Sequence, residues 1–498
     1  MKRAISIVIS LTLVAAVFTG CGKGNNTSSG LINNKPKGEL VVEDAGTDEY
    51  AKYDTTGEVT VAINTVRPAD SEALFDAFSN VYPNIKLKFV YYSDVNGAGE
   101  YLTTKAATGE LPDVIFDDPQ NLQYYLTQGW VYPLDSYVKG DKIFEDCVPK
   151  NLVENYTFNG KLYALPHQCG FAGFFVNMDI LDELNLDMPD YDWTVTDMID
   201  FMKKTTTDKY SAIEDVGAIN GFLPPLYSKG TDMYAYNPST HHFDISAIAK
   251  GAQVIRELRE YPGLEGWSLN LTADASGKTD YERKFGVKYV AGKLSAWYNG
   301  GMALLATQGT WNYAQEKELS NFTLGFLPYP QSSDMPGRMQ IHVDHCFMTT
   351  AAKNPDAAFQ VLRYITYSTE GNLARLSMYD EENKGKYALN SDKYFPTTTN
   401  EKVAEKFKSL PSVTEQDVYF FENIKNGYRG DPWKYAPGVE EVIGTVISPI
   451  ALEVIGGGLG NSALSAELER KANAAMDKAI AEYNAKVNKA YAEFNAAH

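Results

Sequence analysis

Residues 58–92 read EVTVAINTVRPADSEALFDAFSNVYPNIKLKFVYY and contain a strand pattern, a helix pattern and a second strand pattern in succession. Residues 58–64 alternate and then become apolar, which is typical of a buried strand. Residues 71–81 place Ala, Leu, Phe and Val at helical spacing, and residues 85–91 alternate again. We therefore expect a β–α–β unit near the start of the folded body.

The alternation of strands and helices continues along the chain. Residues 100–108 and 122–128 predict helices, and residues 113–116 predict a third strand between them. This succession favours a mostly parallel sheet in an α/β lobe. The ligand crevice of such a sheet lies beyond the carboxyl ends of its strands. We therefore expect the residues just after Asn64 and just after Phe116 to meet a ligand.

Length and charge narrow the class of protein. The chain has 498 residues. A body of roughly 440 residues exceeds what one hydrophobic core usually supports, so we expect two lobes. The formal net charge of −19 argues against nucleic acid or an anionic membrane surface as a partner, because both need clustered cations. The 33 Tyr, 23 Phe and 6 Trp leave aromatic rings for a stacking surface after the core is filled.

The first part of the chain has the pattern of an export signal. Lys2 and Arg3 precede an apolar run over residues 4–18, which suits a secretory signal and is too short to span a membrane. The Thr-Gly pair before Cys21 resembles the lipobox of bacterial lipoproteins, whose cysteine becomes the lipidated first residue. The alternative is an ordinary secretory signal with a chance cysteine. Both alternatives place the protein outside the cytoplasm.

The residues after this signal are polar. We expect residues 1–20 to be a signal peptide and residues 21–56 to be a lipidated, flexible linker that anchors the body to the outer face of the cell membrane. The other cysteines, Cys147, Cys169 and Cys346, form no metal-binding spacing and allow at most one disulfide. We expect them to be buried free thiols.

Several segments together resemble the extracellular solute-binding proteins of carbohydrate ABC transporters, in the class typified by maltose-binding protein. The resemblance covers residue 58 to the end of the chain. It rests on six motifs in the order of that family, at residues 102–116, 159–177, 188–198, 290–311, 326–330 and 354–364. Residues 218–271 are poorly matched, which leaves the ligand less defined than the fold.

This resemblance implies an α/β fold of two lobes joined by hinge crossovers, with the ligand between the lobes. The first lobe would comprise residues 57–167 and 342–388, and the second residues 168–341 and 389–498. Crossings are expected near residues 166–171, 341–344 and 387–395. It also implies a monomer that passes an oligosaccharide to the permease subunits of an ABC importer, without a cofactor.

A sugar site needs flat aromatic rings and convergent polar groups, because sugars present apolar C–H faces and hydroxyls. The resemblance makes Trp311 the principal stacking residue, with Trp433 and Trp267 as further candidates; each could instead be core packing. The polar candidates follow predicted strands or lie at expected crossings: Asn64, Arg67, Asp117, Asp118, Gln120, His167, Gln168, His342 and Asp344. Helix capping is the alternative role of the acids and amides that follow the third strand.

Two other classes of function stay open. A glycan hydrolase could use Asp117 and Asp118, but glycosidases place their two carboxyls on different elements, roughly 5–10 Å apart. A sugar sensor or adhesin without a permease would have the same body. His342, Asp344 and His345 resemble a metal-binding pattern, but with no further ligand at helical spacing we do not expect zinc.

Overall fold

The structure is a computed structural model, and it describes residues 40–46, 48–64, 71–93, 98–118, 122–290, 293–387, 389, 393–456, 462–492 and 494. The chain divides into two compact units, Met1–Glu39 and Leu40–His498, and every described residue belongs to the second unit. The predicted signal peptide, Cys21 and the first part of the predicted linker lie outside the described residues.

The predicted β–α–β unit is confirmed. Strand β1 (Gly57–Asn64) leads through α1 (Ser71–Val81) to β2 (Ile85–Tyr92), which pairs with β1 in parallel. After α2 (Gly99–Ala107), strand β3 (Val114–Asp118) pairs in parallel with the other edge of β1. The alternation of apolar residues along the chain thus predicts these elements to within two residues.

The sheet is extended by two long strands that run antiparallel to each other. Strand β6 (Leu165–Asn177) and strand β11 (Gln340–Met348) are paired, and β11 also pairs antiparallel with β3. The strand order is β10-β6-β11-β3-β1-β2. The short strand β12 (Tyr428–Arg429) pairs in parallel with the start of β11.

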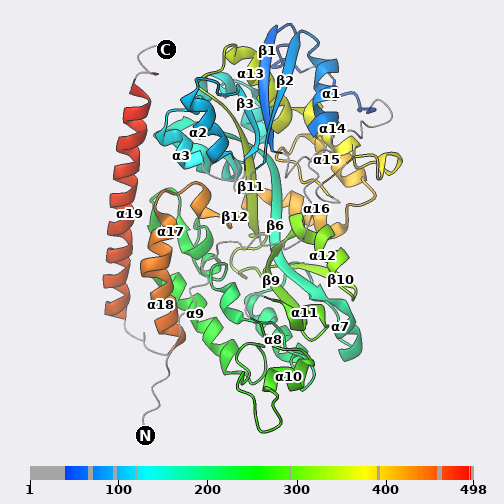
Figure 1. The fold of residues 1–498 in the computed structure, drawn as a ribbon, viewed down its shortest axis with the longest axis vertical. Helices are drawn as coiled ribbons and strands as arrows, with labels where there is room; N and C mark the ends of the chain where they lie inside the picture. The colour runs from blue at the N-terminus through cyan, green and yellow to red at the C-terminus, as the bar shows by residue number, and fades with distance from the viewer. Residues whose placement is uncertain are drawn as a thin grey trace. The chain divides into compact units, whose positions relative to one another are not determined.

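Strand β6 changes partners along its length (Figure 1). Residues 165–171 pair with β11, whereas residues 172–177 pair with β9 (Leu304–Gly309) and β10 (Leu324–Pro328). One continuous strand therefore links the sheet that contains β1–β3 to the strands β9 and β10. The change of partner falls at the segment where we expect the first crossing; the lobe boundaries themselves stay predictions.

The helices cover the strands and divide the apolar interior into three cores. The first core joins β1, β3 and β11 to α13 (Pro355–Thr366). The second joins the end of β6 to α8 (Val195–Thr205), whose N-cap, Thr194, forms a capping box with Asp197. The third joins α9 (Ile245–Glu260), α18 (Ser448–Ile455) and part of α19 (Ser462–Ala490).

The end of the predicted linker is packed on the body. Asp48 is buried and pairs with the buried guanidinium of Arg363 on α13, at 2.7 Å. The Tyr53 hydroxyl donates to Glu370 of α14 (Thr369–Ser377), at 2.5 Å. The expectation that flexibility extends to residue 56 is therefore wrong for the described residues from Leu40 onward. The polar composition of this segment does not identify Arg363 and Glu370 as the partners of Asp48 and Tyr53.

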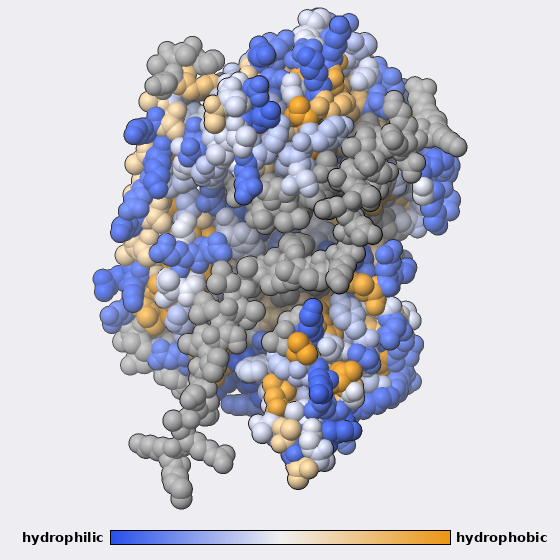
Figure 2. All heavy atoms as spheres, viewed as in Figure 1, coloured by the Kyte–Doolittle hydropathy of each residue, from blue (hydrophilic) through white to orange (hydrophobic). Residues whose placement is uncertain are grey.

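Cys169 and Cys346 are buried free thiols, as predicted, and Cys147 is a half-buried free thiol. Burial raises the pKa of the Cys169 thiol. Across the described residues, every helix is too short or too polar to cross a membrane. Figure 2 shows one face of the molecule, on which hydrophilic residues are widespread and hydrophobic residues gather in small groups.

Candidate functional site

The side chain of Trp311 packs against two glycines. It is in a 3₁₀ turn (Thr310–Asn312) that directly follows β9, and its ring covers Gly309 and Gly170 of β6. A Cβ atom on Gly170 would lie 2.6 Å from Trp311 Cε3, which is too close for any other residue without movement of the ring. The backbone N–H of Phe171 donates to Thr310 Oγ1 at 3.2 Å and fixes the turn against β6.

His342 on β11 forms the next part of the site. Its ring centroid lies 4.7 Å from that of Trp311, at an interplanar angle of 59°. His342 Nε2 lies 3.0 Å from Nε2 of Gln340, within hydrogen-bonding distance. His342 Nδ1 in turn faces Asp431 Oδ2 at 3.6 Å. The half-buried tryptophan thus has a polar ring beside it in a set orientation.

A buried network of charges lies beside His342. Lys434 Nζ is 3.0 Å from Asp344 Oδ1 and 2.9 Å from Asp431 Oδ2, and Arg429 Nε is 2.9 Å from Asp431 Oδ1. Gln168 on β6 donates from Nε2 to the other oxygen of Asp344 at 3.0 Å. Two cations therefore oppose two carboxylates, and the charges of these four side chains sum to zero.

The network keeps its members ionised. Burial alone would raise the pKa of Asp431, but the nearby Arg429 and Lys434 outweigh burial and hold that pKa well below its usual range. Burial would likewise lower the pKa of Lys434, and the carboxylates of Asp344 and Asp431 outweigh burial and raise it. Each charge is thus stabilised in its ionised form by its partners, so removing one would leave another uncompensated.

A second layer supports this network from behind. The backbone N–H of Arg429 donates to Asp232 Oδ1 at 2.8 Å, and the Tyr435 hydroxyl donates to the other oxygen of the same carboxyl. Burial raises the pKa of Asp232 to about 6, against the opposing effect of these hydrogen bonds and of Arg429. Tyr156 extends the layer, because its hydroxyl donates to the Val343 carbonyl at 3.1 Å.

Trp433 lies at the edge of this group. It is half-buried against the third core, in a 3₁₀ turn (Pro432–Lys434) whose last residue is the network lysine. Gln123 on α3 (Leu122–Thr127) donates from Nε2 to the Trp433 carbonyl at 2.6 Å. This hydrogen bond connects the helix that follows β3 with the turn that carries Trp433.

The structure brings together five of the predicted residues: Trp311, His342, Asp344, Gln168 and, through its turn, Trp433. His167 is buried elsewhere, where its Nδ1 lies 2.8 Å from Arg375 Nη1. Trp267 is 39% exposed, and its indole donates to Glu265 Oε2 at 3.0 Å. Neither contact involves the network.

The remaining predicted residues follow the parallel strands, as expected. Asn64 is buried at the end of β1. Asp117 and Asp118 end β3, and Asp118 is in register with His345 of β11. Arg67 and Gln120 lie outside the described residues.

Four functional candidates were not predicted from the sequence: Gln340, Arg429, Asp431 and Lys434. Three of them flank Trp433 in the run Arg-Gly-Asp-Pro-Trp-Lys, where charges of both signs surround an aromatic residue. A polar site could have been predicted from that run of residues. In the described part of the chain, no group of three or more His, Cys, Asp or Glu residues is arranged to hold a metal ion.

Comparisons with known proteins agree with this architecture. The sequence model of the family "bacterial extracellular solute-binding protein" matches residues 73–381, more than half of the chain. The multiple sugar-binding protein of Streptococcus mutans is 24% identical over 300 residues, which cover 60% of this chain and 65% of that protein. The chain thus matches slightly less than two thirds of this relative's length.

Solved structures share the fold at low sequence identity. A sugar transporter from Rhizobium etli in an open conformation has a TM-score of 0.60 at 16% identity, over 85% of this chain and 99% of that one. The GacH receptor of Streptomyces glaucescens, solved unliganded and with acarbose, has a TM-score of 0.54 at 19% identity, over 86% of this chain and 100% of that one. The chain therefore belongs to the bacterial extracellular solute-binding proteins and has their two-lobed α/β fold.

Proposed function

We propose that this protein is a receptor that binds a neutral oligosaccharide outside the cell and delivers it to an ABC importer. The observation that carries the proposal is the Trp311 ring, which packs against Gly170 and Gly309 beside His342. The Gln168–Asp344 pair follows the Gly170–His342 pair on the same two strands. An aromatic face beside amide, imidazole and carboxylate groups is the combination that a sugar ring requires.

The charge balance supports a neutral ligand. Arg429 and Lys434 are already paired with Asp431 and Asp344, so the network offers no unpaired charge to a charged solute. Amide and carboxylate oxygens of such a network can still accept hydrogen bonds from sugar hydroxyls. An anionic or cationic ligand would have to break a buried ion pair, which is costly.

The relatives support the same class of ligand. One is named for binding multiple sugars, and another was solved with acarbose. Transfer to permease subunits, a monomeric state and anchoring through lipid on Cys21 belong to the proposal on the strength of the family and of the signal at the start of the sequence. A lipid and a polar linker would keep such a receptor near its importer while leaving it free to reorient.

Asp431 is unsuited to the acid–base chemistry of a glycosidase. A glycosidase needs one carboxyl that holds its proton near neutral pH to act as the general acid. Asp431 has a pKa well below its usual range because Arg429 and Lys434 pair with it, so it cannot fill that role. The relative named for sugar binding supports binding without turnover as the behaviour we expect.

Calorimetry against a panel of neutral oligosaccharides tests this proposal. We expect one-to-one binding with a change in tryptophan fluorescence and no product. Replacing Trp311 by Ala removes the stacking face and should weaken binding by roughly tenfold to a hundredfold without unfolding the protein. Trp267→Ala is the matched control, because Trp267 contacts Arg259 and Glu265 instead, and should leave the affinity unchanged.

Two results would contradict the proposal. Equal affinities of the wild type and Trp311→Ala would remove the ring from the site. Release of shortened sugars from any bound oligosaccharide would show that the protein is an enzyme.

A further inference from the structure

Strand β6 contains one more residue than the stretch of β11 that it faces. Pro166 pairs with His345. The next pair along the two strands joins Gln168 to Asp344, so the register shifts by one position between these pairs. His167 is therefore an extra residue in β6, in the manner of a β-bulge, and such bulges are common beside functional sites.

The extra residue decides which part of β6 lies against the candidate site. Beyond it, Gly170 is opposite His342, and Trp311 packs against this glycine. If the pairing continued from the sheet without an extra residue, the strand would be offset by one position and Cys169 would be opposite His342. A side chain in that place would meet the indole, because even a Cβ atom on Gly170 would lie 2.6 Å from Trp311 Cε3.

Two buried side chains hold the backbone carbonyl of His167. The Tyr394 hydroxyl donates to this carbonyl at 2.7 Å and lies 3.1 Å from Asn372 Oδ1, and Arg375 Nη1 of α14 donates to the same carbonyl at 3.3 Å. Arg375 Nη1 also donates to His167 Nδ1 at 2.8 Å, since a guanidinium has only donors. Because both side chains are buried, water competes little for these hydrogen bonds.

The segment that contains Tyr394 is itself attached to β6. Phe395 forms an isolated antiparallel bridge with Cys169, and Thr397 Oγ1 donates to the Pro166 carbonyl at 3.1 Å. These contacts lie on both sides of the extra residue along the strand. They therefore oppose a shift of β6 by one position.

We propose that Tyr394 and Arg375 are positioning residues for the sugar site, and that they act through His167. By holding the extra residue, they keep Gly170 opposite His342 and leave room for the indole of Trp311. This role rests on the proposed function, because the site that it serves is the proposed sugar site. Molecules in which β6 is offset would not bind, so the apparent affinity falls with the fraction of molecules in the correct register.

Two conservative variants test this role. Tyr394→Phe removes the hydroxyl and keeps the ring, and Arg375→Lys keeps the charge but loses the fork of donors. We expect each variant to lower the affinity about threefold to tenfold, and the double variant to lower it more than about tenfold. Calorimetry measures the change, with the neutral oligosaccharide that the wild type binds most tightly in the panel.

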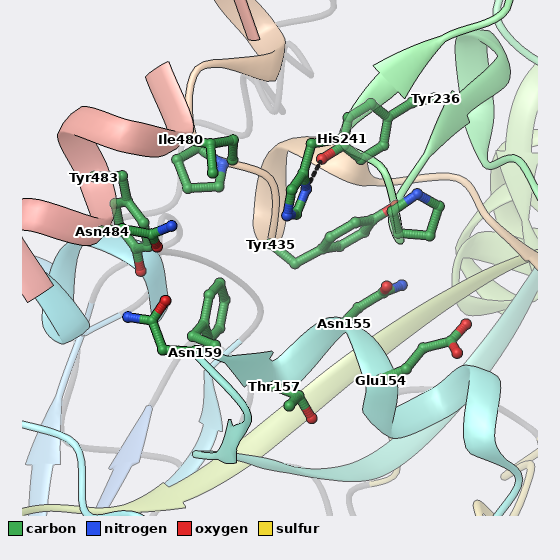
Figure 3. Close-up of a pocket in the computed structure, with 13 residues that line it drawn as sticks. Glu154, Asn155, Thr157, Asn159, Tyr236, His241, Tyr435, Ile480, Tyr483 and Asn484 are labelled. Carbon is green, nitrogen blue, oxygen red and sulfur yellow. Dashed lines mark hydrogen bonds between the residues drawn. The ribbon is translucent and has the colours of Figure 1, made fainter. Parts of the chain in front are cut away.

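Tyr236→Phe is the matched control. Tyr236 is in β7 (Tyr236–Asn237), and its buried hydroxyl is 2.8 Å from His241 Nδ1 at a recess lined in part by α19 (Figure 3). The variant also removes one tyrosine hydroxyl that bonds to a histidine, but this histidine belongs to neither β6 nor β11. It should lower the melting temperature about as much as Tyr394→Phe and leave the affinity unchanged.

A disulfide reports the register without any sugar. Cys169 is opposite Val343, and directly opposite residues of antiparallel strands have Cα atoms about 4.5–5.5 Å apart, within the range of a disulfide. We expect copper phenanthroline to oxidise the thiols of Cys169 and of the variant Val343→Cys to a disulfide, which peptide mapping detects. The yield should fall when Tyr394→Phe and Arg375→Lys are added, because the offset strand places Cys169 opposite His342.

The outcomes separate this role from the proposed function. Lower affinity and lower disulfide yield in the Tyr394 and Arg375 variants, with wild-type affinity in Tyr236→Phe, would support the positioning role. Wild-type affinity in the double variant, or an equal loss of affinity in Tyr236→Phe, would overturn it. If the wild type binds no oligosaccharide of the panel, the proposed function is wrong, and an unchanged disulfide yield in the double variant would then overturn the positioning role by itself.

Discussion

Gly170 determines how closely the Trp311 ring can approach β6. Its lack of a side chain is needed for contact, since a Cβ atom would meet the indole at 2.6 Å. A glycine in the middle of a strand usually weakens the strand, but at this position the missing side chain leaves room for the indole ring.

Replacing Gly170 by Ala should therefore displace the Trp311 ring. We expect sugar affinity to fall by about tenfold or more, with a stability loss of about 1–3 kcal/mol from overpacking. Calorimetry and urea unfolding measure the two effects. Gly444→Ala is the matched control, because a Cβ atom there has open space, and it should stabilise its helical segment by about 0.5–1 kcal/mol. Unchanged affinity of the Gly170 variant would mean that the indole is not part of the site.

Glu214 makes the stability of the protein dependent on pH. Burial raises its pKa to about 7, with smaller contributions from Asp215 and Glu265 and an opposing hydrogen bond from Tyr281. The folded state therefore holds this proton more tightly than the unfolded chain, in which the pKa is near 4.5. Its contribution to stability is present below about pH 4.5 and is lost as the pH rises through about 7.

The variant Glu214→Gln cannot titrate and should keep its stability over this interval. Its melting temperature should therefore rise relative to that of the wild type between pH 5 and pH 8. Thermal unfolding of both proteins at several pH values measures the difference. Parallel profiles would show that Glu214 has an ordinary pKa in the folded protein.

At the scale of elements, the segment that precedes β1 acts as part of the fold. Asp48 reaches the completely buried guanidinium of Arg363, which also pairs with Asp141 at 2.8 Å. We expect Asp48→Asn to cost about 1–2 kcal/mol in urea unfolding, less than the loss of an isolated buried pair, because Asp141 remains. Glu49→Gln changes an exposed neighbour in the same way and should have little effect. Equal stabilities of the two variants would mean that the segment is not docked in solution.

Elements with a regular apolar pattern could be predicted from the sequence, and those that depend on distant partners could not. The helices α1, α2 and α3 lie close to their predicted ranges, because apolar residues recur in them at helical spacing. Strand β6 has no continuous apolar pattern in the sequence, because His167, Gln168 and Gly170 interrupt its apolar residues. It is one strand because β11 supports its first half and β9 and β10 its second.

The residues of the candidate site also fall into those that could be predicted from the sequence and those that depend on distant partners. Trp311 was found from a family resemblance, and His342 and Asp344 from their place at an expected crossing. Arg429 and Asp431 were missed because a charged run normally predicts an exposed loop. Their burial depends on the pairing of β12 with β11, which joins segments nearly ninety positions apart and has no local signature.

At the scale of the whole body, two elements connect its cores. Strand β6 continues from the sheet of β1–β3 to β9 and β10, and α19 packs on both the first and the third core (Figure 1). A ligand that favours a closed arrangement must supply contacts that are absent in the open one.

The docked segment before β1 also has a mechanical consequence. A force applied to the chain from its N-terminal side reaches the contacts of residues 43–53 with the body, which include the ion pairs of Glu43 with Lys406 and of Asp48 with Arg363. These contacts carry the load before β1 does, because they come earlier in the chain. A pull from that side therefore has to break these contacts before it can disturb the sheet that contains β1.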